Sequence, residues 1–157
     1  MARLRGRALR GDRCRAAVPH EHWKTTTFTG ALRVDGMTAP MVLDGPMNRG
    51  TFQAYIEQVL VPTLRRGDTV IMDNLPAHKG AEVRRAIEEG GATLRYLPPY
   101  SPDFNPIENA FSNLQAFLRK AAARTTDDLW EVIRDALPRF SPQDRANYFT
   151  AAGYEPD

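Results

Sequence analysis

The sequence predicts an α/β fold with a mixed β-sheet, because an antiparallel hairpin comes first and a parallel strand–helix–strand unit follows. The dipeptide Asp35-Gly36, typical of hairpin turns, separates two segments rich in β-branched and apolar residues. Within residues 68–97 an apolar segment, a helical segment and a second apolar segment follow one another, which is the order of a parallel crossover. The length of 157 residues is that of one domain.

The first half of the chain supplies the hairpin and a helix. Residues 23–34 predict a strand, with a shorter strand before it over residues 14–18, and residues 37–43 predict the returning strand. A turn at residues 44–46 ends the hairpin. Apolar residues then recur at helical spacing up to a breaker segment at residues 62–67. The residues of this apolar stripe are Phe52, Tyr55, Ile56, Val59 and Leu60.

The crossover follows directly. Residues 68–73 form a short apolar run, which predicts a strand buried on both faces. A helix is expected over residues 80–89, ending at Gly90-Gly91. Residues 92–97 predict the second parallel strand.

The last third of the chain is predicted to be helical. A stiff proline-rich loop over residues 98–102 leads into a long helix over residues 106–124, and a second helix is expected over residues 126–140. Phe117 and Trp130 lie at helical spacing with other apolar residues, so both are predicted to be core residues.

Composition excludes several classes of protein. With 42% hydrophobic and 25% charged residues the chain is neither disordered nor fibrous, and its single cysteine, Cys14, excludes an internal disulfide. No apolar run approaches the roughly 20 residues that span a bilayer, so no membrane partner is expected. A cytoplasmic location is the natural expectation for such a chain.

Positive charge gathers at the N-terminus although the whole chain carries only +2. Residues 1–15 hold six arginines against the single acid Asp12. Such an arm could bind the phosphates of DNA, since each neutralised phosphate releases a counterion. The alternative, which this feature alone favours, is an arginine-rich end exposed to solvent.

Two acidic residues follow the two predicted parallel strands. Asp73 comes where the first strand ends, and Glu108 is the third residue of the long helix that follows the second strand. Ligands collect at the carboxyl ends of such strands, and Mg²⁺ is held by one or two carboxylates. The alternative is structural: Asp73 would be a turn residue, and Glu108 would complete a capping box with Asn105.

Two sequence blocks carry a family resemblance. Residues 70–79 (Val-Ile-Met-Asp-Asn-Leu-Pro-Ala-His-Lys) and residues 97–109 (Leu-Pro-Pro-Tyr-Ser-Pro-Asp-Phe-Asn-Pro-Ile-Glu-Asn) resemble the two most diagnostic blocks of DDE-superfamily transposases of the insertion sequence 630 and mariner-like group. The 34 residues between Asp73 and Glu108 agree with that group. The resemblance extends over nearly the whole chain.

The resemblance implies a ribonuclease-H-like fold with a five-stranded mixed sheet flanked by helices. It implies that Asp73 and Glu108 are the second and third metal-binding catalytic acids, and that Mg²⁺ or Mn²⁺ is the cofactor, two ions serving the complete enzyme. The implied reaction is cleavage of DNA at transposon ends followed by strand transfer to target DNA. Asn74, His78 and Asn105 match positions that the family keeps near the site as outer supports.

The basic residues near these blocks are candidate DNA contacts, and DNA and a second copy of the chain are the expected partners. The candidates are Lys79, Arg119, Lys120 and Arg124. For the three at the end of the long helix, the alternative is interaction with the helix dipole. The helix has Asn113 and Gln115 where relatives usually carry lysines, which removes two phosphate contacts.

The other departure from the family concerns the first strand. In the family that central strand carries the first catalytic Asp, and no matching strand is found here, since Asp12 lacks apolar neighbours. The chain is therefore expected to be one partial catalytic domain, truncated at its N-terminus. Two hypotheses remain: an enzyme fragment, inactive alone, or a non-catalytic remnant that binds DNA or oligomerises and modulates a full-length transposase. The expected parts are a basic arm (residues 1–15), a ribonuclease-H-like core (16–124) and a C-terminal helical extension (125–157).

Overall fold

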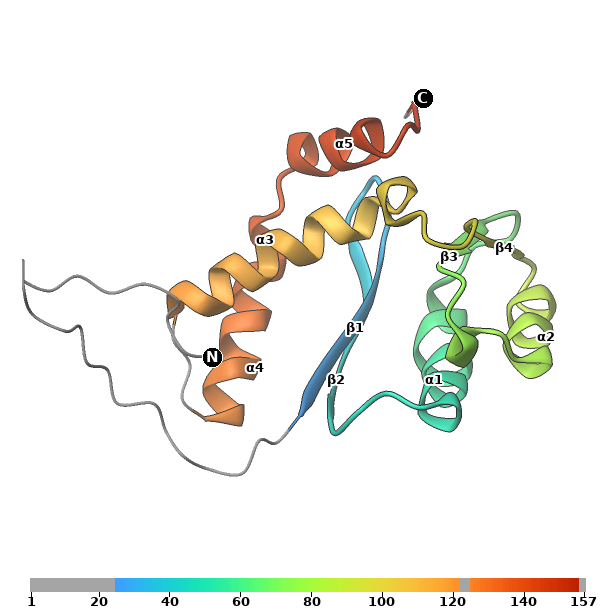
Figure 1. Cartoon of the computed structure of the whole chain (residues 1–157), viewed down its shortest axis with the longest axis horizontal. Coiled ribbons are helices and arrows are strands. Elements are labelled where there is room, and N and C mark those ends of the chain that lie inside the picture. Colours follow the sequence, from blue (N-terminus) through green and yellow to red (C-terminus); the bar gives the residue numbers. More distant parts are fainter. Residues whose placement is uncertain (1–24, 122–124, 156–157) are drawn as a thin grey trace, which may run out of the picture.

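A computed structural model describes residues 25–121 and 125–155 (Figure 1). The basic arm and the predicted strand over residues 14–18 lie outside these ranges. The described strands form two separate two-stranded sheets, one antiparallel and one parallel. The antiparallel and parallel units are thus those predicted, but within the described ranges they do not share one sheet.

The antiparallel sheet is the predicted hairpin of β1 (Thr26–Leu32) and β2 (Met37–Asp44). The turn is closed by hydrogen bonds between Arg33 and Gly36, the shorter being 2.8 Å from Gly36 O to Arg33 N. Thr29 pairs with Met41 and Ala31 with Thr38, so two residues of β2 oppose one of β1 in a bulge. The bulge contains Pro40, which has no N–H to donate to the sheet.

The bulge forces Ala39 into a left-handed backbone conformation, with φ of 51°. The hydroxyl of Tyr55 donates a 3.0 Å hydrogen bond to the Ala39 carbonyl, inside the core. A helix residue therefore supports an irregularity in the sheet.

The parallel sheet is the predicted crossover, in which β3 (Thr69–Met72) and β4 (Thr93–Tyr96) flank α2 (Ala81–Glu89). The prediction that the first of these strands is buried on both faces is wrong, because Ile71 is 39% exposed. Met72 points into the core, whereas the opposite face of β3 is only partly covered by the described residues.

The helix between the sheets begins as predicted but changes geometry. α1 (Arg49–Tyr55) starts at an Asn48 capping box with Thr51. It continues as a π-helix over Ile56–Leu60 and a 3-10 turn over Val61–Thr63. The wider turn comes directly before Pro62, whose ring cannot be placed in a regular α-helix interior.

The C-terminal part has three helices. α3 (Pro106–Ala121) and α4 (Thr126–Ala136) match the two predicted helices, and a 3-10 turn over Leu137–Arg139 extends α4. α5 (Pro142–Ala151) was not predicted. Its signal was in the sequence: Ser141 caps the helix, Pro142 is its first residue and Asp144 completes the capping box.

The hairpin separates two hydrophobic clusters (Figure 1). One cluster joins α1, α2, β3 and β4, and Ala31, Ala39 and Met41 of the hairpin pack against it. The other joins α3, α4 and α5, and the opposite face of the hairpin packs against it through Phe28, Leu32, Met37 and Val42. Both faces of β1 and β2 are therefore covered, as the alternation of side chains along a strand allows.

The predicted core residues of the long helices differ in outcome. Phe117 packs beside the second cluster and lies under the Arg139 guanidinium, 5.6 Å from it. Trp130 is 44% exposed, so its assignment to the core is wrong. The buried residues of α4 are Ile133 and Ala136, which form a narrow apolar face. The Trp130 indole lies outside that face.

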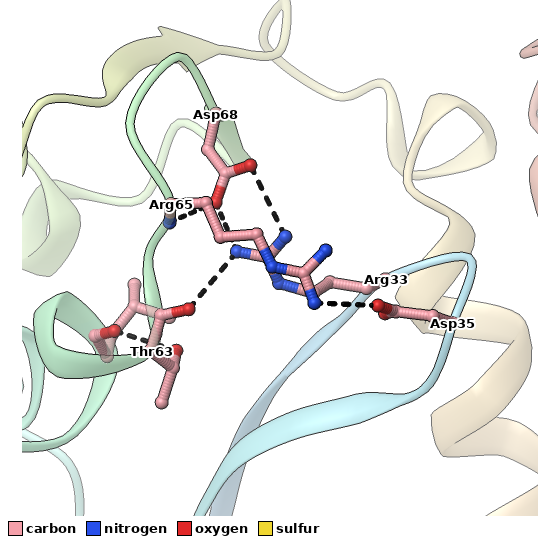
Figure 2. A network of polar contacts seen from close by, with 6 residues as sticks. Arg33, Asp35, Thr63, Arg65 and Asp68 are labelled. Atoms are coloured by element: carbon pink, nitrogen blue, oxygen red, sulfur yellow. Dashed lines mark hydrogen bonds and ion pairs between the residues drawn. The ribbon is translucent and has the colours of Figure 1, made fainter.

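Polar contacts join the two sheets at one end (Figure 2). Arg33, directly after β1, binds the carboxylate of Asp68, directly before β3, and donates a 3.3 Å bond to the Thr63 carbonyl. The Arg33 hydrogen bond is the main cause that lowers the pKa of Asp68. Asp68 also accepts from the Arg65 amide at 2.7 Å, and Arg65 pairs with Asp35 at 3.0 Å. The end of β1 is thereby held beside the start of β3.

Candidate acidic site at the ends of β3 and β4

The two predicted catalytic acids follow the two strands of the parallel sheet. Asp73 comes immediately after β3, and Glu108 lies in the first turn of α3, which the chain reaches from β4 through a proline-rich loop. The parallel pairing continues past the strands through a 2.9 Å bond from Leu97 N to Met72 O. Asp73 therefore lies on the loop after β3, and Glu108 lies on the helix reached by the loop after β4; both loops leave from the same edge of the sheet.

Glu108 is exposed, and its amide donates to the Asn105 carbonyl at 3.1 Å. In the described ranges no hydrogen bond or ion pair joins Glu108 to Asp73, and no group of three or more Asp, Glu, His or Cys residues is arranged to hold a metal. Their approach to a common ion stays a prediction.

His78 is the residue that the structure brings to Asp73. Its Nδ1 is in ion-pair contact with Asp73 Oδ1, and the imidazole side chain is 19% exposed. This contact is not a hydrogen bond, and Nδ1 is a buried nitrogen without a hydrogen-bond partner in the described part of the chain. The imidazole therefore lies directly against one oxygen of the Asp73 carboxylate.

The imidazole is held in place by the core. It stacks on Phe52 of α1 with ring centroids 4.1 Å apart and planes 25° apart. The His78 backbone carbonyl accepts a 2.9 Å bond from the hydroxyl of Tyr96 at the end of β4. Phe52 and Tyr96 are supporting residues that the sequence did not reveal, because they are 26 and 18 residues from His78.

Asp73 also performs the structural role that was its alternative. Its Oδ1 accepts from the Leu75 amide at 3.4 Å, a long contact typical of a turn aspartate. A bond of that length leaves most of the acceptor capacity of the carboxylate free. Asn74 is half-buried beside it.

Asn105 lies in extended backbone between a 3-10 turn (Pro102–Phe104) and α3. Its amide donates to the Pro102 carbonyl at 2.9 Å. The neighbouring Phe104 carbonyl accepts a 3.1 Å bond from the Tyr154 hydroxyl, which comes from the chain after α5. The C-terminal helices therefore support the turn that precedes Glu108.

The candidate DNA contacts fall in two places. Lys79 is exposed on the loop after β3, next in sequence to His78. Arg119 is 11 residues beyond Glu108 on α3, which is about 16 Å along the helix and about 20° around it. Glu108 and Arg119 therefore lie on one face of α3, near its opposite ends.

Lys120 and Arg124 differ in what the structure says of them. Lys120 is exposed and lines a hollow of about 260 Å³ with Asp135 and Arg139. Arg124 lies outside the described residues. Asn113, where the family resemblance implies a lysine, donates a 2.6 Å bond to the Tyr148 hydroxyl and joins α3 to α5.

The donor set is compatible with a hard divalent cation. Asp73 and Glu108 offer carboxylate oxygens, and the Asp73 side chain is 39% exposed. Mg²⁺ takes one or two carboxylates and completes its coordination shell with water and phosphate oxygens.

None of the described helices is long and apolar enough to cross a bilayer.

Comparisons with known proteins agree with the predicted family. The family described as DDE superfamily endonuclease matches residues 1–130. The transposable element Tcb2 transposase of Caenorhabditis briggsae is 24% identical over 97 residues, which are 59% of this chain and 36% of that protein.

The fold is similar to that of solved transposase structures. A crystal structure of the Mos1 strand transfer complex superposes with a TM-score of 0.73 and 18% identity, covering 96% of this chain and 46% of that one. A pre-cleavage Mos1 transpososome gives a TM-score of 0.50 at 16% identity, with 99% and 52% covered. The chain thus spans about half or less of the length of these three proteins.

The similarity to Mos1 confirms the ribonuclease-H-like α/β class predicted from the sequence. Since the family match covers well over half of its residues, the chain belongs to the DDE superfamily endonucleases, and its fold is similar to that of the Mos1 mariner transposase.

Proposed function

We propose that this chain is part of a transposase catalytic domain, in which Asp73 and Glu108 are two acids of the DDE triad. The observation that carries the proposal is the placement of the two acids after adjacent parallel strands, with His78 against Asp73. The substrate class is DNA at transposon ends and at the target, and the chain is one partial domain with the arm, core and helical extension predicted above.

The two carboxylates would hold Mg²⁺ or Mn²⁺, one or two ions, which when bound stabilise the attacking and leaving oxygens of phosphodiester cleavage. His78, fixed by Phe52, keeps the Asp73 carboxylate from rotating freely. Asn74, on the loop after β3, and Asn105, on the loop after β4, would act as outer supports of the site. Lys79 binds a phosphate beside the acids, and Arg119 and Lys120, with Arg124, bind phosphates further along α3.

A second candidate is a non-catalytic remnant that binds DNA or another transposase copy and modulates a full-length enzyme. It is favoured by one observation: although His78 contacts Asp73, no three Asp, Glu, His or Cys side chains of the described ranges are arranged to hold a metal. On this proposal the chain alone does not cut DNA.

The shared cation site can be tested by titrating the chain with Mn²⁺ and recording the loss of backbone amide NMR signals near the paramagnetic ion. We expect signals around residues 73–75 and 107–109 to broaden together. Asp73→Asn should weaken the broadening at both segments, and Glu108→Gln should do the same. Both effects follow if the carboxylates bind one ion.

Asp103→Asn is the matched control, because Asp103 is an exposed acid in the 3-10 turn just before α3 and has no proposed role. It should leave both effects unchanged. Broadening of only one segment, or equal weakening by Asp103→Asn, would contradict the shared site. DNA nicking by the purified chain that depends on Asp73 would contradict the remnant and favour a complete enzyme.

A further inference from the structure

Large apolar side chains stand exposed on the loops that leave the acidic edge of the parallel sheet. Leu75 follows β3 and is 52% exposed, while Tyr100 and Phe104 follow β4 and are 102% and 52% exposed. Exposed apolar groups gathered in one region mark an interaction site more often than isolated ones do. Tyr100 is the extreme case, since its side chain is as accessible as in an unfolded chain.

The backbone conformation of Tyr100 is also unfavourable, so the stability of the fold gives no reason for a tyrosine at this position. Its φ is 57°, in the left-handed region that costs energy for a bulky residue. Such strain is ordinarily offset by packing of the side chain, but the Tyr100 ring is fully exposed. A glycine would satisfy the turn better.

The loop is built to keep this conformation. Pro98 and Pro99 precede Tyr100, and Pro102 follows two residues later, so three of the five residues 98–102 have a fixed φ. The Ser101 hydroxyl donates a 3.3 Å bond to the Pro99 carbonyl across the turn. The ring is thus presented to solvent by a stiff segment, and little conformational entropy is lost when it binds a ligand.

The chemistry of the neighbourhood selects the ligand. An aromatic ring with two free faces stacks on flat π systems, and nucleobases are stacked by such residues in proteins that bind single strands. Lys79 is exposed on the adjacent loop and can neutralise a phosphate of the same strand. In a regular duplex the faces of the bases are already stacked, so only an unpaired base is available.

We propose that Tyr100 stacks on an unpaired nucleobase of DNA bound at the Asp73–Glu108 edge, with Leu75 and Phe104 as apolar neighbours on the two loops. This inference rests on the proposed function, because it takes DNA as the ligand. It adds a contact that distinguishes DNA with unpaired bases from fully paired DNA.

The test compares two DNA hairpins of the same duplex sequence, each closed by a non-nucleotide linker in place of a loop of bases. One is blunt, and the other has a two-nucleotide 3′ overhang that carries 2-aminopurine. At low salt we expect the wild-type chain to bind the overhang about 5- to 10-fold more tightly, as one stacked base provides. Stacking should also quench 2-aminopurine fluorescence.

Tyr100→Gly should abolish the preference and the quenching, leave the affinity for the blunt hairpin unchanged and not lower the thermal midpoint. Tyr100→Trp should retain the preference. Trp130→Ala is the matched control, since Trp130 is an exposed aromatic residue on α4, away from these loops, and its loss should change neither binding constant.

Equal wild-type affinity for the two hairpins, or a preference that survives in Tyr100→Gly, overturns the inference while leaving DNA binding intact. A lowered midpoint with loss of both affinities in Tyr100→Gly assigns Tyr100 a structural role and also overturns it. Binding to neither hairpin by the wild-type chain refutes the DNA partner of the proposed function itself.

Discussion

Tyr55 is a helix residue whose hydroxyl supports an irregular strand. It is 3% exposed, burial raises the pKa of its phenol, and its hydroxyl binds the carbonyl of Ala39 at the left-handed position of the β2 bulge. We expect Tyr55→Phe to lower the free energy of unfolding by about 1–2 kcal/mol, because the buried carbonyl loses its partner. Urea denaturation measures this change. Tyr100→Phe, which removes an exposed hydroxyl, should stay within about 0.5 kcal/mol of wild type, and an equal cost for both would contradict the role given to Tyr55.

His78 combines a packing role with a polar one, and two substitutions separate them. His78→Phe keeps a ring on Phe52, so the free energy of unfolding should change little, but Asp73 loses its polar neighbour and Mn²⁺ broadening at residues 73–75 should weaken. His78→Ala should weaken the broadening and also lower stability by about 1 kcal/mol through the lost ring contact. Full Mn²⁺ broadening in His78→Phe would show that the imidazole does not orient Asp73.

At the scale of elements, the contact between the end of β1 and the start of β3 predicts a pH dependence. The Arg33 hydrogen bond holds the pKa of Asp68 below its ordinary 3.8, so this carboxylate stabilises the folded state above that pH and the contribution is lost as pH falls through 3.8 and below. Asp68→Asn should therefore cost about 1 kcal/mol at pH 7 and progressively less below pH 4. Denaturant unfolding of both proteins between pH 7 and pH 3 measures the difference.

Asp35→Asn is the control for that experiment. Asp35 pairs with Arg65, but the two side chains are 58% and 70% exposed, so solvent screens the pair and its loss should be almost neutral. A difference between wild type and Asp68→Asn that stays constant with pH would contradict the link between the Asp68 charge and stability.

Whole-molecule electrostatics predict weak, sequence-independent DNA binding. The net charge is only +2, so affinity depends on local groups of basic residues, and log K should fall steeply with log salt. Replacing Arg119 and Lys120 with Gln should reduce the magnitude of that slope by about 2. Gel-shift titrations at two salt concentrations measure it; an affinity insensitive to salt, or a preference for one duplex sequence, would contradict the prediction.

The division into two sheets predicts self-association. In the described ranges β1 pairs only with β2 and β3 only with β4, so each has one edge without a partner strand. We expect sedimentation velocity to show concentration-dependent association, and Ile71→Lys on β3 to reduce it more than Val34→Lys, an exposed control beside the hairpin turn. An N-terminal extension that supplies an Asp-bearing strand should instead give a stable monomer with Mg²⁺-dependent nicking. A wild-type chain that is monomeric at every concentration would contradict the prediction that the unpaired strand edges cause self-association.

Local sequence patterns by themselves determined the order of the elements, the hairpin turn, the crossover, the helices up to residue 136 and the family of the two acidic blocks. These depend on side-chain periodicity, turn residues and neighbouring positions, all of which are visible within a few residues. α5 could have been predicted from its Ser141 cap.

Only the tertiary structure decided how distant residues meet. The stacking of His78 on Phe52, the bond of Arg33 to Asp68, the support of Ala39 by Tyr55 and the exposure of Trp130 join or separate positions far apart in sequence. No local period encodes such contacts, because they depend on which faces remain uncovered once the elements have packed. The sequence predicted that Asp73 and Glu108 lie at one sheet edge, whereas the contact between His78 and Asp73 became visible only in the folded chain.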